Sequence, residues 1–119
     1  MKKSVLIADT QENTRETLKH ILSHRFPLIL VESPAHGLEV LARGKTPDAL
    51  AFIGLNDETG TSTRVFAEIR GRFPDLTVIA VGDHKSDELA VEAVRQGATG
   101  YMIKPFKPDE IIAAAEKSC

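Results

Sequence analysis

The chain has 119 residues, of which 42% are hydrophobic and 27% charged, and its formal net charge is −2. This length and composition are typical of one globular domain with a single hydrophobic core, so one domain is expected over residues 1–119. The basic residues form no stripe, which argues against nucleic acid or a membrane surface as a partner. The apolar run after the first lysines ends at Asp9, and the sole cysteine is Cys119. No signal peptide, transmembrane helix or internal disulfide is therefore predicted, and a cytoplasmic location is expected.

Short apolar runs alternate with segments of helical periodicity along the whole chain. Continuous apolar runs rich in β-branched residues are typical of strands that helices cover on both faces, as in a parallel sheet. The expected strands are 4–9, 28–33, 49–53, 77–81 and 100–103. The expected helices are 13–26, 34–43, 62–73, 86–96 and 108–117.

Local signals support the ends of these helices. Ser33 is a favourable N-cap, and Pro34 suits the first helical position after it. Pro74 prevents the third helix from continuing, and Gly97 ends the fourth.

The alternation of five strands with five helices predicts the fold class. Strands that are each followed by a helix form right-handed crossovers, which build a doubly wound parallel sheet with helices on both faces. We expect an α/β fold of the flavodoxin-like type with strand order 2-1-3-4-5 and five helices in a single domain.

In such a sheet, functional residues lie outside the carboxyl ends of the strands, near the switch point between strands 1 and 3. The first strand ends in Asp9 and Thr10, and the third ends in Ile53 and Gly54. The fourth strand ends in Gly82, and the fifth ends in Lys104.

At these positions the sequence resembles the receiver domains of two-component response regulators, of which the chemotaxis protein CheY is an example. The resemblance covers the whole chain and is carried by "VLIADTQENTRETL", "PDALAFI" and "VEAVRQGATGYMIKPF". It implies an acidic pair after strand 1 and an aspartate at the end of strand 3, which together hold Mg²⁺. In this family the strand 3 aspartate accepts a phosphoryl group from a histidine kinase. A hydroxyl residue after strand 4 and a lysine after strand 5 bind the phosphoryl oxygens.

Carried over by position, the resemblance assigns only part of this set to the chain. Asp9 matches the first acidic residue, but Thr10 stands at the second position. Ile53 stands at the phosphoacceptor position, five residues after Asp48, and Gly82 replaces the hydroxyl residue. Lys104 is retained. The resemblance therefore indicates a degenerate receiver, or pseudo-receiver.

The chemistry of these side chains agrees with this interpretation. Isoleucine is not a nucleophile and cannot form an acyl phosphate. Mg²⁺ prefers octahedral oxygen ligands with one or two carboxylates, and Asp9 beside Thr10 is a weak site, so no cofactor is expected. We expect Asp9 and Lys104 to form an ion pair at the sheet edge instead.

Two alternatives stay open. Asp57, in the loop after strand 3, or Asp9 could accept a phosphoryl group with Mg²⁺ in an unusual geometry. A pocket formed by Thr10, Gly54, Gly82 and the "ETGTST" loop could instead bind a small anion.

The resemblance also implies a protein partner. Receivers commonly use the face made by their fourth helix, fifth strand and fifth helix, here 86–96, 100–103 and 108–117. Tyr101 matches the aromatic residue on strand 5 that swings in this family to report phosphorylation, and it lies on this face either as a core residue or as a contact residue. The expected partners are a histidine kinase, an effector or output domain, or a second copy of the chain. No catalytic triad, CxxC or GxGxxG motif is present, so an enzyme is not predicted.

Overall fold

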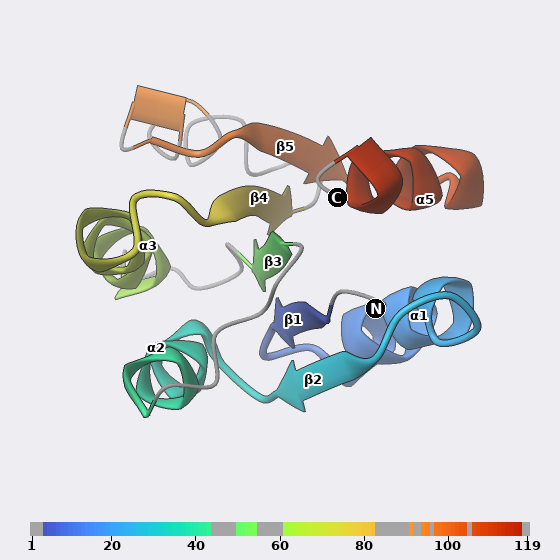
Figure 1. Ribbon diagram of the computed structural model, residues 1–119, viewed down its shortest axis with the longest axis horizontal. Helices are drawn as coiled ribbons and strands as arrows, with labels where there is room; N and C mark the ends of the chain where they lie inside the picture. The colour runs from blue at the N-terminus through green and yellow to red at the C-terminus, as the bar shows by residue number, and fades with distance from the viewer. Residues whose placement is uncertain are drawn as a thin grey trace.

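The computed structural model has a parallel five-stranded sheet at its centre, with the order β2-β1-β3-β4-β5 (Figure 1). The structure describes residues 4–43, 50–54, 61–82, 91, 94–95, 97–104 and 106–117. The strands are β1 Val5–Ala8, β2 Leu28–Val31, β3 Leu50–Gly54, β4 Thr77–Gly82 and β5 Gly100–Ile103. The helices are α1 Glu12–Leu22, α2 Pro34–Ala42, α3 Thr61–Arg72 and α5 Pro108–Lys117.

The helices form a layer on each face of the sheet. Figure 1 shows α1 beside α5 on one face and α2 beside α3 on the other, and these pairs are in contact. The predicted flavodoxin-like fold and strand order are confirmed. The described part of the chain contains four of the five predicted helices. Residues 91, 94 and 95 are helical, and the remainder of the predicted helix 86–96 lies outside the described residues.

Alternation of side chains along the strands divides the core into two clusters. Along β3, Ala51 and Ile53 face the cluster that includes Phe66 of α3, whereas Leu50 and Phe52 face the cluster that includes residues of α1 and α5. The strands are buried on both faces at the centre of the sheet because each face carries a helical layer. This explains why the strand sequences are continuously apolar.

Most helix boundaries agree with the sequence signals. The Ser33 hydroxyl accepts a hydrogen bond from the backbone N–H of His36 at 3.1 Å, which confirms the predicted N-cap of α2. The predicted helix 13–26 was too long, because α1 ends at Leu22. After it, the N–H groups of Arg25 and Phe26 both donate to the carbonyl of Leu22, which tightens the chain into a turn.

Two glycines allow close approaches that shape the fold. A Cβ at Gly37 of α2 would lie 3.0 Å from the Cβ of Ala8, so this glycine lets α2 pack directly on β1. Gly97, just before β5, has a φ of +107°, and a Cβ there would lie 2.7 Å from Cγ of Arg70. The Arg70 guanidinium donates to the carbonyl of Leu76, so the side chain under Gly97 is held in place.

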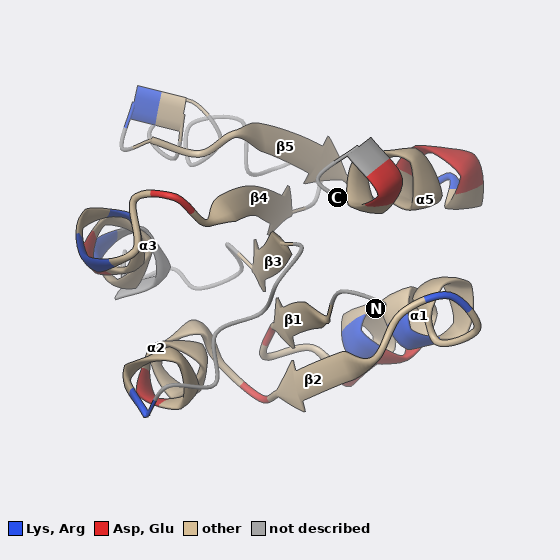
Figure 2. Cartoon of the chain, viewed as in Figure 1, with Lys and Arg blue, Asp and Glu red and all other residues tan. Residues whose placement is uncertain are grey.

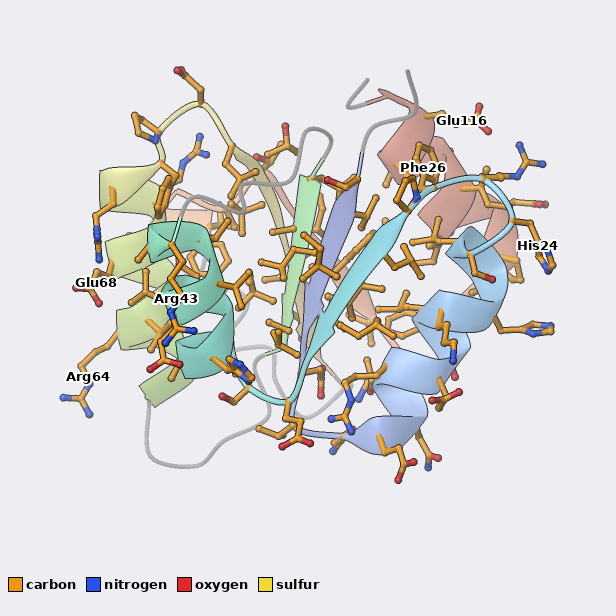
Figure 3. All side chains as sticks on the ribbon, turned by 60° about the horizontal axis from the view of Figure 1, so that its bottom comes forward. His24, Phe26, Arg43, Arg64, Glu68 and Glu116 are labelled. Carbon is orange, nitrogen blue, oxygen red and sulfur yellow. The ribbon has the colours of Figure 1, made fainter. Side chains whose placement is uncertain are left out.

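The charged residues lie outside the sheet. Figure 2 shows that none of the strands carries a charged residue and that acidic and basic residues are interspersed on the helices and turns. Figure 3 shows Arg43, Arg64 and Glu68 pointing away from the sheet on the α2–α3 layer. Within the described residues, no helix is long and apolar enough to cross a membrane.

Candidate functional site

Asp9 follows the last residue of β1 and is almost fully buried, with 1% of its surface exposed. Its backbone N–H donates to the carbonyl of Val31, which continues the pairing of β1 with β2. Its Oδ1 accepts the N–H of Gln11 at 2.7 Å, and its carbonyl accepts a hydrogen bond from Arg15 at 2.8 Å. A carboxylate beside the first residues of α1 is also favoured by the helix dipole. Asp9 therefore has a structural role at the start of α1.

Lys104 follows the last residue of β5, and its position is fixed by the sheet. Its backbone N–H donates to the carbonyl of Gly82 at 2.9 Å, so the β4–β5 pairing continues through this residue. Its ammonium donates to Oε1 of Gln11 rather than to the Asp9 carboxylate. Arg25–Glu116 is the ion pair found within the described part of the chain. The expected Asp9–Lys104 pair is thus replaced by a contact between Lys104 and a neutral amide.

Ile53 is fully buried near the end of β3. It lies in register with Ala8 of β1 and Ala80 of β4, one residue before the strand ends. Its side chain belongs to the cluster that includes Phe66, on the face covered by α2 and α3. It is therefore packed into the core beneath the sheet edge.

The other residues singled out from the sequence have different environments. Thr10 is exposed after Asp9, and Gly82 is buried at the end of β4. Tyr101 of β5 is half-buried and packs against the same cluster as Ile53. Asp57 and the "ETGTST" loop up to Gly60 lie outside the described residues.

The described residues at this edge do not fit a magnesium site. Asp9 is the carboxylate that directly follows β1, and one of its oxygens already accepts a backbone N–H. Thr10 and Ile53 replace the further carboxylates that Mg²⁺ would need. Among the described residues, no group of three or more His, Cys, Asp or Glu side chains could hold a metal ion.

A pocket of about 350 Å³ lies beside the Lys104–Gln11 contact, between the start of α1 and the segment after β5. It is lined by Gln11, Asn13, Thr14, Thr17, Lys104 and Phe106. The lining combines one ammonium with amide and hydroxyl groups. This set of donors suits a small anion better than a cation. It does not include Thr10, Gly54 or Gly82, which the sequence suggested for such a pocket.

Comparison with known proteins identifies the family. The model of the response regulator receiver domain matches residues 5–116 of this chain. The chain belongs to the response regulator receiver domain family. Receiver domains of this family are signalling domains of two-component systems, and they interact with kinases and output domains.

Several relatives resemble this receiver domain along most of its length. It is 35% identical over 114 residues to the acid tolerance regulatory protein ActR of Rhizobium meliloti, covering 94% of this chain and 57% of ActR. It is 28% identical to an NtrX-like response regulator of Rickettsia bellii, covering 97% of this chain and 24% of that protein. The receiver domain therefore spans between about a quarter and just over half of the length of these curated relatives.

Solved structures agree with the fold. The crystal structure of the receiver domain of NtrX from Brucella abortus superposes with a TM-score of 0.83 at 26% identity, covering 96% of each chain. A CheY-like receiver domain protein from Methanospirillum hungatei superposes with a TM-score of 0.86 at 20% identity, which supports the fold alone.

The sequence did not predict the side-chain contact between the start of α1 and the end of β5. Gln11 accepts from Lys104, and the buried Thr14 hydroxyl donates to the same Gln11 oxygen at 3.4 Å. The available signal was the i, i+3 spacing of two polar residues at the start of a helix, which is typical of side chains that interact locally. Neither residue is charged, so a search for catalytic groups passes over them.

Proposed function

We propose that this receiver domain acts without aspartyl phosphorylation and signals through protein–protein contacts. The observation that supports this proposal is the complete burial of Ile53 near the end of β3. The isoleucine side chain has no group that could accept a phosphoryl group. It fills space in the core on the side of the sheet covered by α2 and α3. The domain would then hold one conformation, where phosphorylatable receivers shift between two.

The surroundings of Ile53 support the same proposal. Asp9 is engaged at the start of α1, and Lys104 is engaged by Gln11. Gly82 offers no hydroxyl to a phosphoryl oxygen. Asp9 and Lys104 thus have structural contacts, and Ile53 and Gly82 have no functional group, at four of the positions where phosphate or metal chemistry would be expected.

Intact-mass spectrometry after incubation with acetyl phosphate and Mg²⁺ tests this proposal. We expect no added phosphoryl group on this chain, while a conventional receiver treated in parallel is labelled. If the chain gains one phosphoryl group, the proposal is wrong and Asp57 or Asp9 is the acceptor. The variant Asp57→Ala then distinguishes these two residues, because it keeps the label if Asp9 is the acceptor.

The proposed contact surface is the β5 edge of the sheet. Three apolar side chains are exposed there, Val91 at 61%, Val94 at 55% and Ile103 at 44%. Leu30 is also exposed, at 38%, but it lies on β2 at the opposite edge (Figure 1). Exposed apolar side chains among mixed charges suit a modest protein interface, with a kinase, an output domain or a second copy of the chain.

Sedimentation velocity over a range of protein concentrations tests the last of these partners. We expect a concentration-dependent dimer that Val94→Asp weakens at least about tenfold, because a carboxylate would be desolvated in the apolar interface. Leu30→Asp is the matched control and should leave the dimer unchanged. A wild-type chain that stays monomeric, or an equal loss in both variants, contradicts self-association through this surface.

The pocket beside Lys104 supports a second candidate function, binding of a small anion. Its ammonium and neutral donors have the chemistry for such a ligand. An increase in melting temperature with inorganic phosphate would favour it, because a ligand that binds only the folded state stabilises that state.

A further inference from the structure

The contact between Gln11 and Lys104 links the carboxyl ends of β1 and β5, which are not adjacent strands. β3 and β4 lie between β1 and β5 in the strand order, and the two residues are 93 positions apart in the chain. The contact therefore spans the carboxyl ends of two intervening strands. These strands end in Gly54 and Gly82, neither of which has a side chain.

The position of Gln11 is fixed from several sides. Its backbone N–H donates to Asp9, and its carbonyl accepts from the N–H of Arg15 at 3.2 Å. The hydroxyl of Thr14, a residue that is 2% exposed, donates to the Oε1 of Gln11. The Thr14 hydroxyl therefore orients the side-chain oxygen of Gln11 independently of Lys104.

Helix capping does not account for a glutamine at this position. Gln11 is the N-cap residue of α1, but its side chain makes no capping hydrogen bond. Ser, Thr, Asp and Asn are the residues that cap helices best, because their short side chains reach the free N–H groups. The glutamine side chain instead extends to the lysine at the end of β5.

From these contacts we infer that Gln11 is a built-in partner of Lys104, and that the Gln11–Lys104 bridge holds the end of β5 against the start of α1 while shielding the ammonium from anions. This inference rests on the proposed function, since a receiver that lacks an acceptor carboxylate needs another partner for this lysine. The amide oxygen orients the ammonium without neutralising its charge. An anion in the adjoining pocket therefore meets an ammonium that already has one of its three N–H donors and its orientation taken up by Gln11.

Amide hydrogen exchange tests whether the Gln11–Lys104 bridge holds the end of β5 in place. In Gln11→Ala, the exchange rate of the Lys104 amide should rise about five- to tenfold, because a hydrogen bond to a charged group has been lost. The Thr99 amide, which donates to Val78 at the other end of β5, is the internal reference and should not change. Asn13→Ala is the matched control, because Asn13 lines the same pocket without taking part in the bridge.

Titration with inorganic phosphate, followed by NMR shifts of the backbone amides of Thr17 and Phe106 in the pocket, tests whether the bridge shields the Lys104 ammonium. Phosphate affinity should be highest in Gln11→Ala, lower in the wild-type chain and lowest in Gln11→Glu, whose carboxylate neutralises the lysine. Lys104→Ala should remove the response. Equal affinities across the Gln11 series, or an unchanged Lys104 exchange rate in Gln11→Ala, would overturn the inference. The proposed function has a separate test. If the wild-type chain gains a phosphoryl group from acetyl phosphate, the proposed function alone is overturned.

Discussion

Replacing Ile53 by aspartate will lower the free energy of unfolding by about 3–5 kcal/mol at neutral pH, because it leaves an unpaired carboxylate in the core. Ile53 is fully buried in the cluster that includes Phe66 and Ala80. Proteins of this size have unfolding free energies of about 5–15 kcal/mol, so the loss is a large part of the total. Chemical denaturation of both chains measures it.

The destabilisation should depend on pH in a defined direction. Burial raises the pKa of the introduced carboxyl above the value of about 3.9 that it has in the unfolded chain. The folded variant therefore binds its proton more tightly than the unfolded variant does. Its stability relative to the wild-type chain should be greatest at acidic pH and fall as pH rises above that unfolded-state pKa.

Two further substitutions at position 53 keep this prediction testable. Ile53→Asn should be destabilised without the pH dependence, and Ile53→Val should lose only about 0.5–1.5 kcal/mol. If Ile53→Asp is instead as stable as the wild-type chain and gains a phosphoryl group from acetyl phosphate, the side chain at this position reaches the sheet edge. That result would contradict the assignment of position 53 to the core.

Gly97→Ala is expected to lower the free energy of unfolding by about 1–3 kcal/mol, since the backbone is in a region that side chains rarely adopt. The φ of +107° strains any non-glycine residue, and the new methyl would meet the Arg70 side chain at 2.7 Å. Arg70 cannot move away without losing its hydrogen bond to the Leu76 carbonyl. Urea denaturation with an unchanged slope would show that stability alone has changed.

Gly71→Ala is the matched control for this substitution. Gly71 lies in α3, is exposed, and has nothing within 4 Å of the position that a Cβ would occupy. Alanine there should stabilise the chain by about 0.5–1 kcal/mol, because glycine is unfavourable inside a helix. A loss of similar size in both variants would show that the Gly97 turn does not require glycine.

The fold could be predicted because its determinants are local. Each strand is a continuous apolar run, and alternation with helices leaves few topologies to choose from. The overlong helix 13–26 shows where periodicity fails. Phe26 continues the apolar spacing of Ile21 and Leu22, but it packs from the turn after α1 against the same core cluster. The spacing of apolar residues in the sequence is the same whether Phe26 lies in a helix or in a turn, because its side chain packs against the core in either case.

The candidate site could be predicted only in part. The strand ends correctly located Asp9, Gly82 and Lys104 at one edge of the sheet, because parallel strands bring their carboxyl ends together. The Asp9–Lys104 pair was wrong, since Asp9 finds a backbone N–H two residues away and such local hydrogen bonds need no loop closure. The actual partner, Gln11, is uncharged, and charge pairing could not point to it.

The contact between α1 and α5 has a consequence for the order of assembly. On the α2–α3 side of the sheet, the buried members of the core cluster all precede β5 in the chain, and Tyr101 of β5 packs against them. The opposite side includes Ile111 and Ala115 of α5, so the apolar faces of α1 and β1 lack their full cover until α5 has been synthesised. A chain emerging from the ribosome would therefore expose an apolar surface until α5 has been synthesised, and chaperones would find their binding site on that side of the nascent domain.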